Sequence, residues 1–286
     1  MFSLPQLPIC ELLPQLSKAL TDTPSGGIII TAPPGSGKTT VVPLALLEEQ
    51  YLSGKQILLL EPRRMAARLA ARRMASTIGE EVGGTVGYQL RMERRSSKQT
   101  RIMVLTEGVL SRMLIDDPEL ANVGAIIFDE FHERSIHADF GLALALEVQR
   151  SIRPDLRIII MSATLDAAPI AKHLGEGTPC LEAQGTLFPV ETKYIPMPRE
   201  LRLSEAAAKG IRIAATEQAG SILAFLPGEG EIKATAELLS EFCKERSIEL
   251  APLYAALPLQ EQERALAPAP AGQRKIVLAT SIAESS

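Results

Sequence analysis

Short apolar runs alternate along the chain with longer stretches of helical character. The runs that we expect to be strands form two sets: residues 27–31, 56–60, 102–106, 124–129 and 157–161, and then 221–226, 249–254 and 275–280. Strands separated by helices in this way form βαβ units, in which helices cover both faces of a parallel sheet. The pattern therefore predicts an α/β protein.

The segment from Gly175 to Pro198 is dense in glycine and proline, which is typical of a boundary between domains. We expect a first domain over residues 1–183, a linker over 184–198 and a second domain over 199–286. A second sheet ending with the run at 275–280 would have about three strands, fewer than is usual. We therefore expect the second domain to be incomplete and the sequence to be a fragment of a longer protein.

Composition narrows the class of protein. A hydrophobic content of 46% with 22% charged residues fits a folded globular chain. The net charge of −4 argues against a strong overall attraction to nucleic acid, although basic residues gather between Arg63 and Arg101. There is no membrane-length apolar run and no signal peptide, and the cysteines are isolated from one another. We expect a cytoplasmic protein without structural zinc or contact with a membrane.

A P-loop motif follows the first predicted strand: Ala32, Pro33, Pro34, Gly35, Ser36, Gly37, Lys38 and Thr39, with Thr40 next. The glycines allow backbone N–H groups to surround phosphates at the start of a helix. Lys38 is expected to reach the β- and γ-phosphates, and the Thr39 hydroxyl to bind Mg²⁺. An ordinary glycine-rich turn is the alternative, which the Lys-Thr pair after a strand disfavours. The motif predicts binding of a nucleoside triphosphate.

An acidic pair, Asp129 and Glu130, follows the apolar run at 124–128. Ligands bind at the carboxyl ends of parallel strands, the same edge as the P-loop. Asp129 is a candidate for the Mg²⁺ shell, and Glu130 for polarising the attacking water.

The tetrapeptide Asp129–His132 resembles motif II of the DEAH-box helicases of superfamily 2, and Phe131 in place of alanine indicates the bacterial HrpB-type branch. Further segments are similar to motifs Ia, Ib, III, IV and V, in this order: Glu61–Ala67, Thr106–Leu110, Ser162–Thr164, Leu226–Gly228 and Ala279–Ser286.

The resemblance implies two RecA-like domains that hold ATP and Mg²⁺ between them, with single-stranded nucleic acid, RNA rather than DNA, crossing both. The residues implied to hold the nucleic-acid backbone are Arg63, Arg64, Thr106, Thr280 and Ser281. Such contacts do not read sequence. The resemblance further implies that His132 couples the phosphate site to Ser162 and Thr164.

Two departures from the family concern nucleotide use. Arg73 is the candidate arginine for stacking on the base, but Leu266 occupies the position where the family carries an aromatic partner. Selectivity for adenine is therefore open. Motif VI, whose arginines reach the γ-phosphate, would follow Ser286, so we expect this chain by itself to be impaired in hydrolysis.

Two alternatives remain at this point. One is a P-loop enzyme unrelated to unwinding, such as a kinase. The other is a nucleotide-responsive RNA clamp or scaffold without turnover. The sequence does not reveal the direction of translocation, the pathway, or any protein partner.

Overall fold

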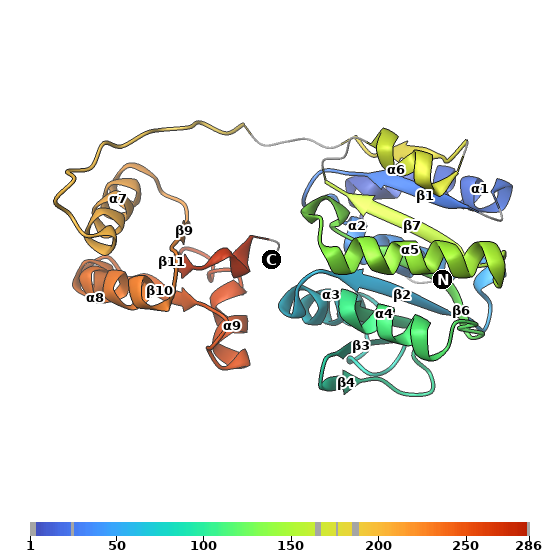
Figure 1. The fold of residues 1–286 in the computed structure, drawn as a ribbon. Coiled ribbons are helices and arrows are strands. Elements are labelled where there is room, and N and C mark those ends of the chain that lie inside the picture. The colour runs from blue at the N-terminus through green and yellow to red at the C-terminus, as the bar shows by residue number, and fades with distance from the viewer. Residues whose placement is uncertain (1–3, 24–25, 164–166, 176, 185–188, 285–286) are drawn as a thin grey trace. The chain divides into compact units, whose positions relative to one another are not determined.

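The computed structural model describes residues 4–23, 26–163, 167–175, 177–184 and 189–284. The chain divides into two compact units, residues 1–188 and 189–286 (Figure 1). Each strand predicted from an apolar run is present in one of these units, so the predicted α/β class is confirmed. Within the described ranges, no helix is both long and apolar enough to cross a membrane.

Unit 1 contains an eight-stranded sheet, in the order β4-β3-β5-β2-β6-β7-β1-β8, flanked by helices. Its elements along the chain are η1 (Pro8–Leu12), α1 (Leu13–Asp22), β1 (Gly27–Thr31), α2 (Lys38–Leu46), η2 (Gln50–Leu52), β2 (Gln56–Glu61), α3 (Arg64–Thr77), β3 (Val86–Leu90), β4 (Glu93–Arg95), β5 (Ile102–Thr106), α4 (Glu107–Asp116), β6 (Val123–Phe128), η3 (Phe131–Glu133), α5 (Ile136–Ser151), β7 (Arg157–Ser162), α6 (Ala167–Leu174) and β8 (Cys180–Glu182).

Alternate residues of each central strand belong to opposite faces of this sheet. Ile28 and Ile30 pack with α1, α2 and α3 in one apolar cluster, whereas Ile29 packs with α4, α5 and α6 in a second cluster. Burial on both faces explains why the strands read as continuous apolar runs rather than as alternating patterns. The sheet is therefore the middle layer of three.

The strands of the sheet are parallel except β4, which pairs antiparallel with β3. Their carboxyl ends therefore meet at one edge of the sheet. The pairs Thr31 with Ser162 and Glu61 with Thr106 are in register at this edge. The loops after β1, β2, β5, β6 and β7 consequently lie together.

Unit 2 contains a three-stranded parallel sheet in the order β10-β11-β9. Its elements are α7 (Leu203–Glu217), β9 (Ile222–Phe225), α8 (Glu229–Glu245), β10 (Ile248–Leu253), α9 (Leu259–Leu266), β11 (Arg274–Ala279) and η4 (Ser281–Ala283). Apolar side chains of α7 and α8 pack against one face of this sheet. On the border strand β9, Leu223 and Phe225 remain 49% and 55% exposed.

Candidate functional site

The loop between β1 and α2 has the backbone geometry of an anion-binding turn. Gly35 and Gly37 have φ angles of +75° and +92°, a region in which side chains are strained. A Cβ atom on Gly37 would lie 2.6 Å from the Leu7 side chain. α2 begins at the next residue, Lys38, and the first N–H groups of a helix have no partner within the helix. The turn therefore offers its backbone donors to a ligand.

Two side-chain contacts join the start of α2 to the end of β6. Lys38 Nζ donates to Glu130 Oε1 at 2.7 Å, and the Thr39 hydroxyl donates to Asp129 Oδ2. The backbone N–H of Asp129 donates to Leu60 O at 3.0 Å, which fixes the carboxylate at the sheet edge. The structure thus brings together the four residues predicted to hold phosphate, metal and water.

A third carboxyl group belongs to this cluster. Glu61 ends β2 and is 2% exposed, and burial, followed by the charges of Asp129 and Glu130, raises its pKa well above the usual range. Burial also raises the pKa of Asp129 to about 6, against the attraction of Lys38. The sequence analysis named Glu61 only within the segment similar to motif Ia and gave it no place in the nucleotide site, although Glu61 ends an apolar run. The cluster therefore holds more acidic groups than its lysine neutralises.

The donor set fits a magnesium nucleotide. The Thr39 hydroxyl and the Asp129 carboxylate are the hard oxygen ligands that Mg²⁺ takes beside substrate phosphates. Ser36, within the glycine turn, has a buried hydroxyl oxygen with no hydrogen-bond partner among the described residues. In the same ranges, no group of three or more His, Cys, Asp or Glu side chains could hold a metal by itself. Metal binding here would therefore need the phosphates as further ligands.

His132 is the last residue of the segment similar to motif II, and it lies beside the segment similar to motif III. Its Nδ1 is 3.3 Å from Glu130 Oε2 and 3.5 Å from the backbone nitrogen of Ala163. Protonated Nδ1 donates to Glu130, whereas unprotonated Nδ1 accepts from Ala163, so the two hydrogen bonds exclude each other. The neighbouring Ser162 hydroxyl is buried without a partner in the described part of the chain. Thr164 lies outside the described residues.

The residues predicted to hold nucleic acid in unit 1 lie at the same edge of the sheet. Arg63 directly precedes α3, Arg64 is its first residue, and Thr106 precedes α4. Arg64 is exposed, while Arg63 is partly buried and contacts Glu133, with Nη2 to Oε2 at 3.2 Å. No local sequence pattern could predict this ion pair, because 70 positions separate its partners. Arg73 is exposed on α3, and its contact with a base stays a prediction.

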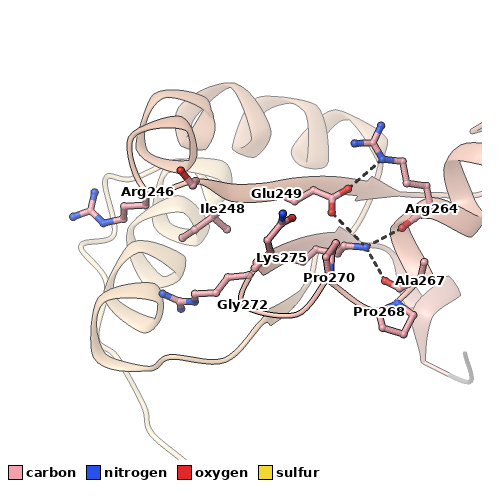
Figure 2. Close-up of a pocket in the computed structure, with 12 residues that line it drawn as sticks. Arg246, Ile248, Glu249, Arg264, Ala267, Pro268, Pro270, Gly272 and Lys275 are labelled. Carbon is pink, nitrogen blue, oxygen red and sulfur yellow. Dashed lines mark hydrogen bonds and ion pairs between the residues drawn. The ribbon is translucent and has the colours of Figure 1, made fainter.

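In unit 2, Thr280 and Ser281 follow β11 at the carboxyl end of the sheet, and Thr280 N donates to Leu253 O at 3.2 Å. A cavity of about 770 Å³ lies instead at the amino ends of β10 and β11 (Figure 2). It contains none of the residues predicted to bind nucleotide or nucleic acid.

Lys275 lies at one side of that cavity and is almost fully buried. Its Nζ donates to the carbonyl oxygens of Arg264 and Ala267 at 2.9 and 2.7 Å (Figure 2). These bonds cap the carboxyl end of α9 and fix the segment around Leu266, the residue at the predicted base-facing position.

Comparisons with known proteins agree with this geometry. Residues 15–172 match the DEAD/DEAH box helicase family. The chain is 46% identical over 280 residues to the ATP-dependent RNA helicase HrpB of Escherichia coli, covering 98% of this chain and 34% of that protein. It is 38% identical over 288 residues to the pre-mRNA-splicing factor ATP-dependent RNA helicase prp22 of Schizosaccharomyces pombe, covering 98% and 24%.

The fold agrees as well. The crystal structure of the E. coli DEAH/RHA helicase HrpB aligns with a TM-score of 0.89 at 45% identity, over 98% of this chain and 35% of that one. A crystal structure of the E. coli DExH-box NTPase HrpB aligns with a TM-score of 0.80 at 44% identity, over 100% and 35%. The chain thus spans about a third or less of the length of these relatives. The likeness confirms the predicted RecA-like α/β fold and the predicted resemblance, and the chain belongs to the DEAD/DEAH box helicase family.

Proposed function

We propose that this chain forms the nucleotide-binding core of an ATP-dependent helicase that acts on single-stranded RNA rather than DNA. We keep the domain division predicted from the sequence: a first domain over 1–183, a linker over 184–198, and a partial second domain over 199–286. The observation that carries the proposal is the pair of contacts Lys38–Glu130 and Thr39–Asp129 beneath the glycine turn. The names of the relatives, both ATP-dependent RNA helicases, support it.

Each of the four side chains predicted from the two motifs would have one task in ATP hydrolysis. Bound Mg²⁺ would neutralise charge on the phosphates, and Thr39 and Asp129 would hold it. Lys38 would exchange Glu130 for the β- and γ-phosphates. Glu130, released from that ion pair, would orient the attacking water through its carboxylate. His132 would then report the state of Glu130 to the segment of Ser162 and Thr164.

The nucleic acid would be held by its backbone. Arg63, Arg64 and Thr106 would contact phosphates in the first domain, and Thr280 and Ser281 in the second. Aromatic residues make up 4% of the chain and tryptophan is absent, so few side chains could stack on bases. Binding would therefore show weak sequence preference.

The proposal is tested by phosphate release from MgATP, with and without poly(U) RNA, together with direct measurement of nucleotide affinity. Lys38→Ala should weaken MgATP binding about 10²–10³-fold, because charge-assisted bonds to two phosphates are lost. Lys18→Ala, an exposed lysine on α1, is the matched control and should bind as the wild type does.

Absence of Lys38-dependent nucleotide binding would refute the proposal. RNA affinity that responds to nucleotide without phosphate release would identify the clamp alternative instead. The same assay tests the expectation that hydrolysis by this 286-residue chain alone is impaired. Fractionation of the producing cell tests the expected cytoplasmic location.

A further inference from the structure

The short helix η3, Phe131–Glu133, begins within motif II and extends one residue beyond it. The residues on either side of it, Glu130 and Arg134, have φ angles of +48° and +47°, unusual for side chains other than glycine. Glu133 N donates to Glu130 O at 2.9 Å across the turn. Phe131 anchors it, because its ring is buried and packs edge-on against Phe128. Glu130 and Glu133 thus belong to one hydrogen-bonded turn.

Glu133 is fastened to the predicted nucleic-acid loop after β2. Its Oε2 accepts from Arg63 Nε at 3.3 Å and from Arg63 Nη2 at 3.2 Å. The two side chains are only 25% and 27% exposed, so solvent screens this pair less than a surface ion pair. A nucleic-acid phosphate that binds Arg63 must compete with this carboxylate.

A second bond fastens the same segment to the loop after β5. The Ser135 hydroxyl donates to Glu107 Oε2 and accepts from Ala138 N at 2.9 Å, which caps α5. Glu107 follows Thr106 directly. The segment after Asp129 thus holds both loops that we propose to contact nucleic acid.

We propose that Glu133 is a positioning residue that couples nucleotide binding to nucleic-acid affinity through Arg63. In the structure Lys38 holds Glu130. When phosphates bind Lys38, Glu130 loses its ion-pair partner. The turn η3 then changes position, and the strength of the ion pair between Glu133 and Arg63 changes with it. By linkage, nucleic acid that takes Arg63 from Glu133 alters nucleotide affinity by the same factor. This inference rests on the proposed function.

The test is the ratio of RNA dissociation constants without and with a non-hydrolysable MgATP analogue, measured with labelled poly(U) on the whole chain. In the wild type we expect a ratio that differs from one by about fivefold or more. In Glu133→Gln the ratio should lie closer to one than in the wild type. RNA should bind about two- to fivefold tighter without nucleotide, because Arg63 loses a charged competitor. Affinity for the analogue without RNA should change by no more than the lost coupling factor, because the contact that is removed differs between the two nucleotide states. The melting temperature should stay near that of the wild type.

Two variants make the test specific. Asp139→Asn removes an ion pair of the same segment, Arg134 with Asp139 at 2.9 Å, which does not reach the loop after β2, and it should keep the wild-type ratio. Glu133→Asp keeps the charge and should restore part of the coupling.

An unchanged ratio in Glu133→Gln would overturn the inference, and so would a wild-type ratio of one when both ligands bind. If the wild type shows no Lys38-dependent binding of the analogue, the proposed function itself fails. That result is distinguishable, because the binding of the analogue is measured separately.

Discussion

In unit 1, the edge of the sheet formed by the carboxyl ends of the strands and the edge formed by their amino ends differ in how charged side chains are paired. At the carboxyl edge, Glu61, Asp129 and Glu130 surround Lys38, and burial raises the pKa of both Glu61 and Asp129. Such a cluster is costly to the apo protein. Its charges are balanced only when a cation and phosphates arrive.

At the amino edge, the chain satisfies its own charges. Arg153 donates to the carbonyl oxygens of Glu119, Leu120 and Val123 at 2.6, 2.8 and 2.9 Å. It also pairs with Asp155, which accepts from Lys55 at 2.6 Å, and these bonds hold the pKa of Asp155 below its usual range.

We infer from this difference that the charged groups at the amino edge stabilise the fold, whereas those at the carboxyl edge are arranged for a ligand. Substitutions at the amino edge should therefore lower the free energy of unfolding and leave nucleotide affinity unchanged. Substitutions of carboxylates at the carboxyl edge should do the reverse.

The largest expected effect is at the amino edge. Arg153→Ala leaves three carbonyl oxygens without their charged donor, so we expect the free energy of unfolding to fall by about 3 kcal/mol. Urea denaturation measures it. Arg112→Ala, which breaks an exposed pair with Asp116 at 4.0 Å, should cost almost nothing. Loss of MgATP affinity in Arg153→Ala, at a temperature where the variant is folded, would contradict the separation of stability and binding between the two edges.

The next effect is the pH dependence of metal-nucleotide binding. In the proposed function Mg²⁺ binds through the Asp129 carboxylate, and burial raises the pKa of this group to about 6. Affinity for MgATP should therefore be constant above that pH and fall about tenfold per unit below it. Calorimetric titration between pH 5 and 8 measures the profile. Asp129→Asn should bind weakly at all pH values, and a wild-type profile flat down to pH 5 would contradict the assignment.

The smallest effect concerns Glu61. Since its pKa is raised in the folded state, its contribution to stability is fully present below the unfolded pKa and is lost as pH rises through the folded pKa. Glu61→Gln removes this loss. The variant should gain stability relative to the wild type between pH 5 and pH 8, by an amount on the order of 1 kcal/mol. Denaturation curves at both pH values measure the gain, and a gain that does not grow between pH 5 and pH 8 would contradict a raised pKa of Glu61 in the folded state.

The strands that the sequence did not reveal share one property. β4 has the sequence Glu93-Arg94-Arg95, and β3 carries Gly87 and Gln89 among its apolar residues. β8 has only three residues, Cys180–Glu182. None of the three has a continuous apolar run. The border strands β4 and β8 lie at the ends of the sheet, where most of their side chains are exposed and burial no longer demands such a run. β3 lies one strand further inside and is mostly buried, but Gly87 and Gln89 interrupt its apolar run.

The site divides in the same way. The meeting of four side chains at the carboxyl ends of the strands was predictable, because it follows from local order: a strand, a glycine turn and a helix, and then a strand with an acidic pair. These side chains are Lys38, Thr39, Asp129 and Glu130. Glu133 was not, since its partner is distant in sequence and its role depends on how two loops approach each other.

The border strands also determine how the chain behaves in concentrated solution. β4, short and charged, discourages addition of a foreign strand to that side of unit 1. β9 has no partner on its outer side among the described strands, and it presents Leu223 and Phe225 to solvent. A stock of this chain should therefore self-associate through unit 2 well before unit 1 loses its fold, which makes low protein concentration a condition for meaningful affinity measurements.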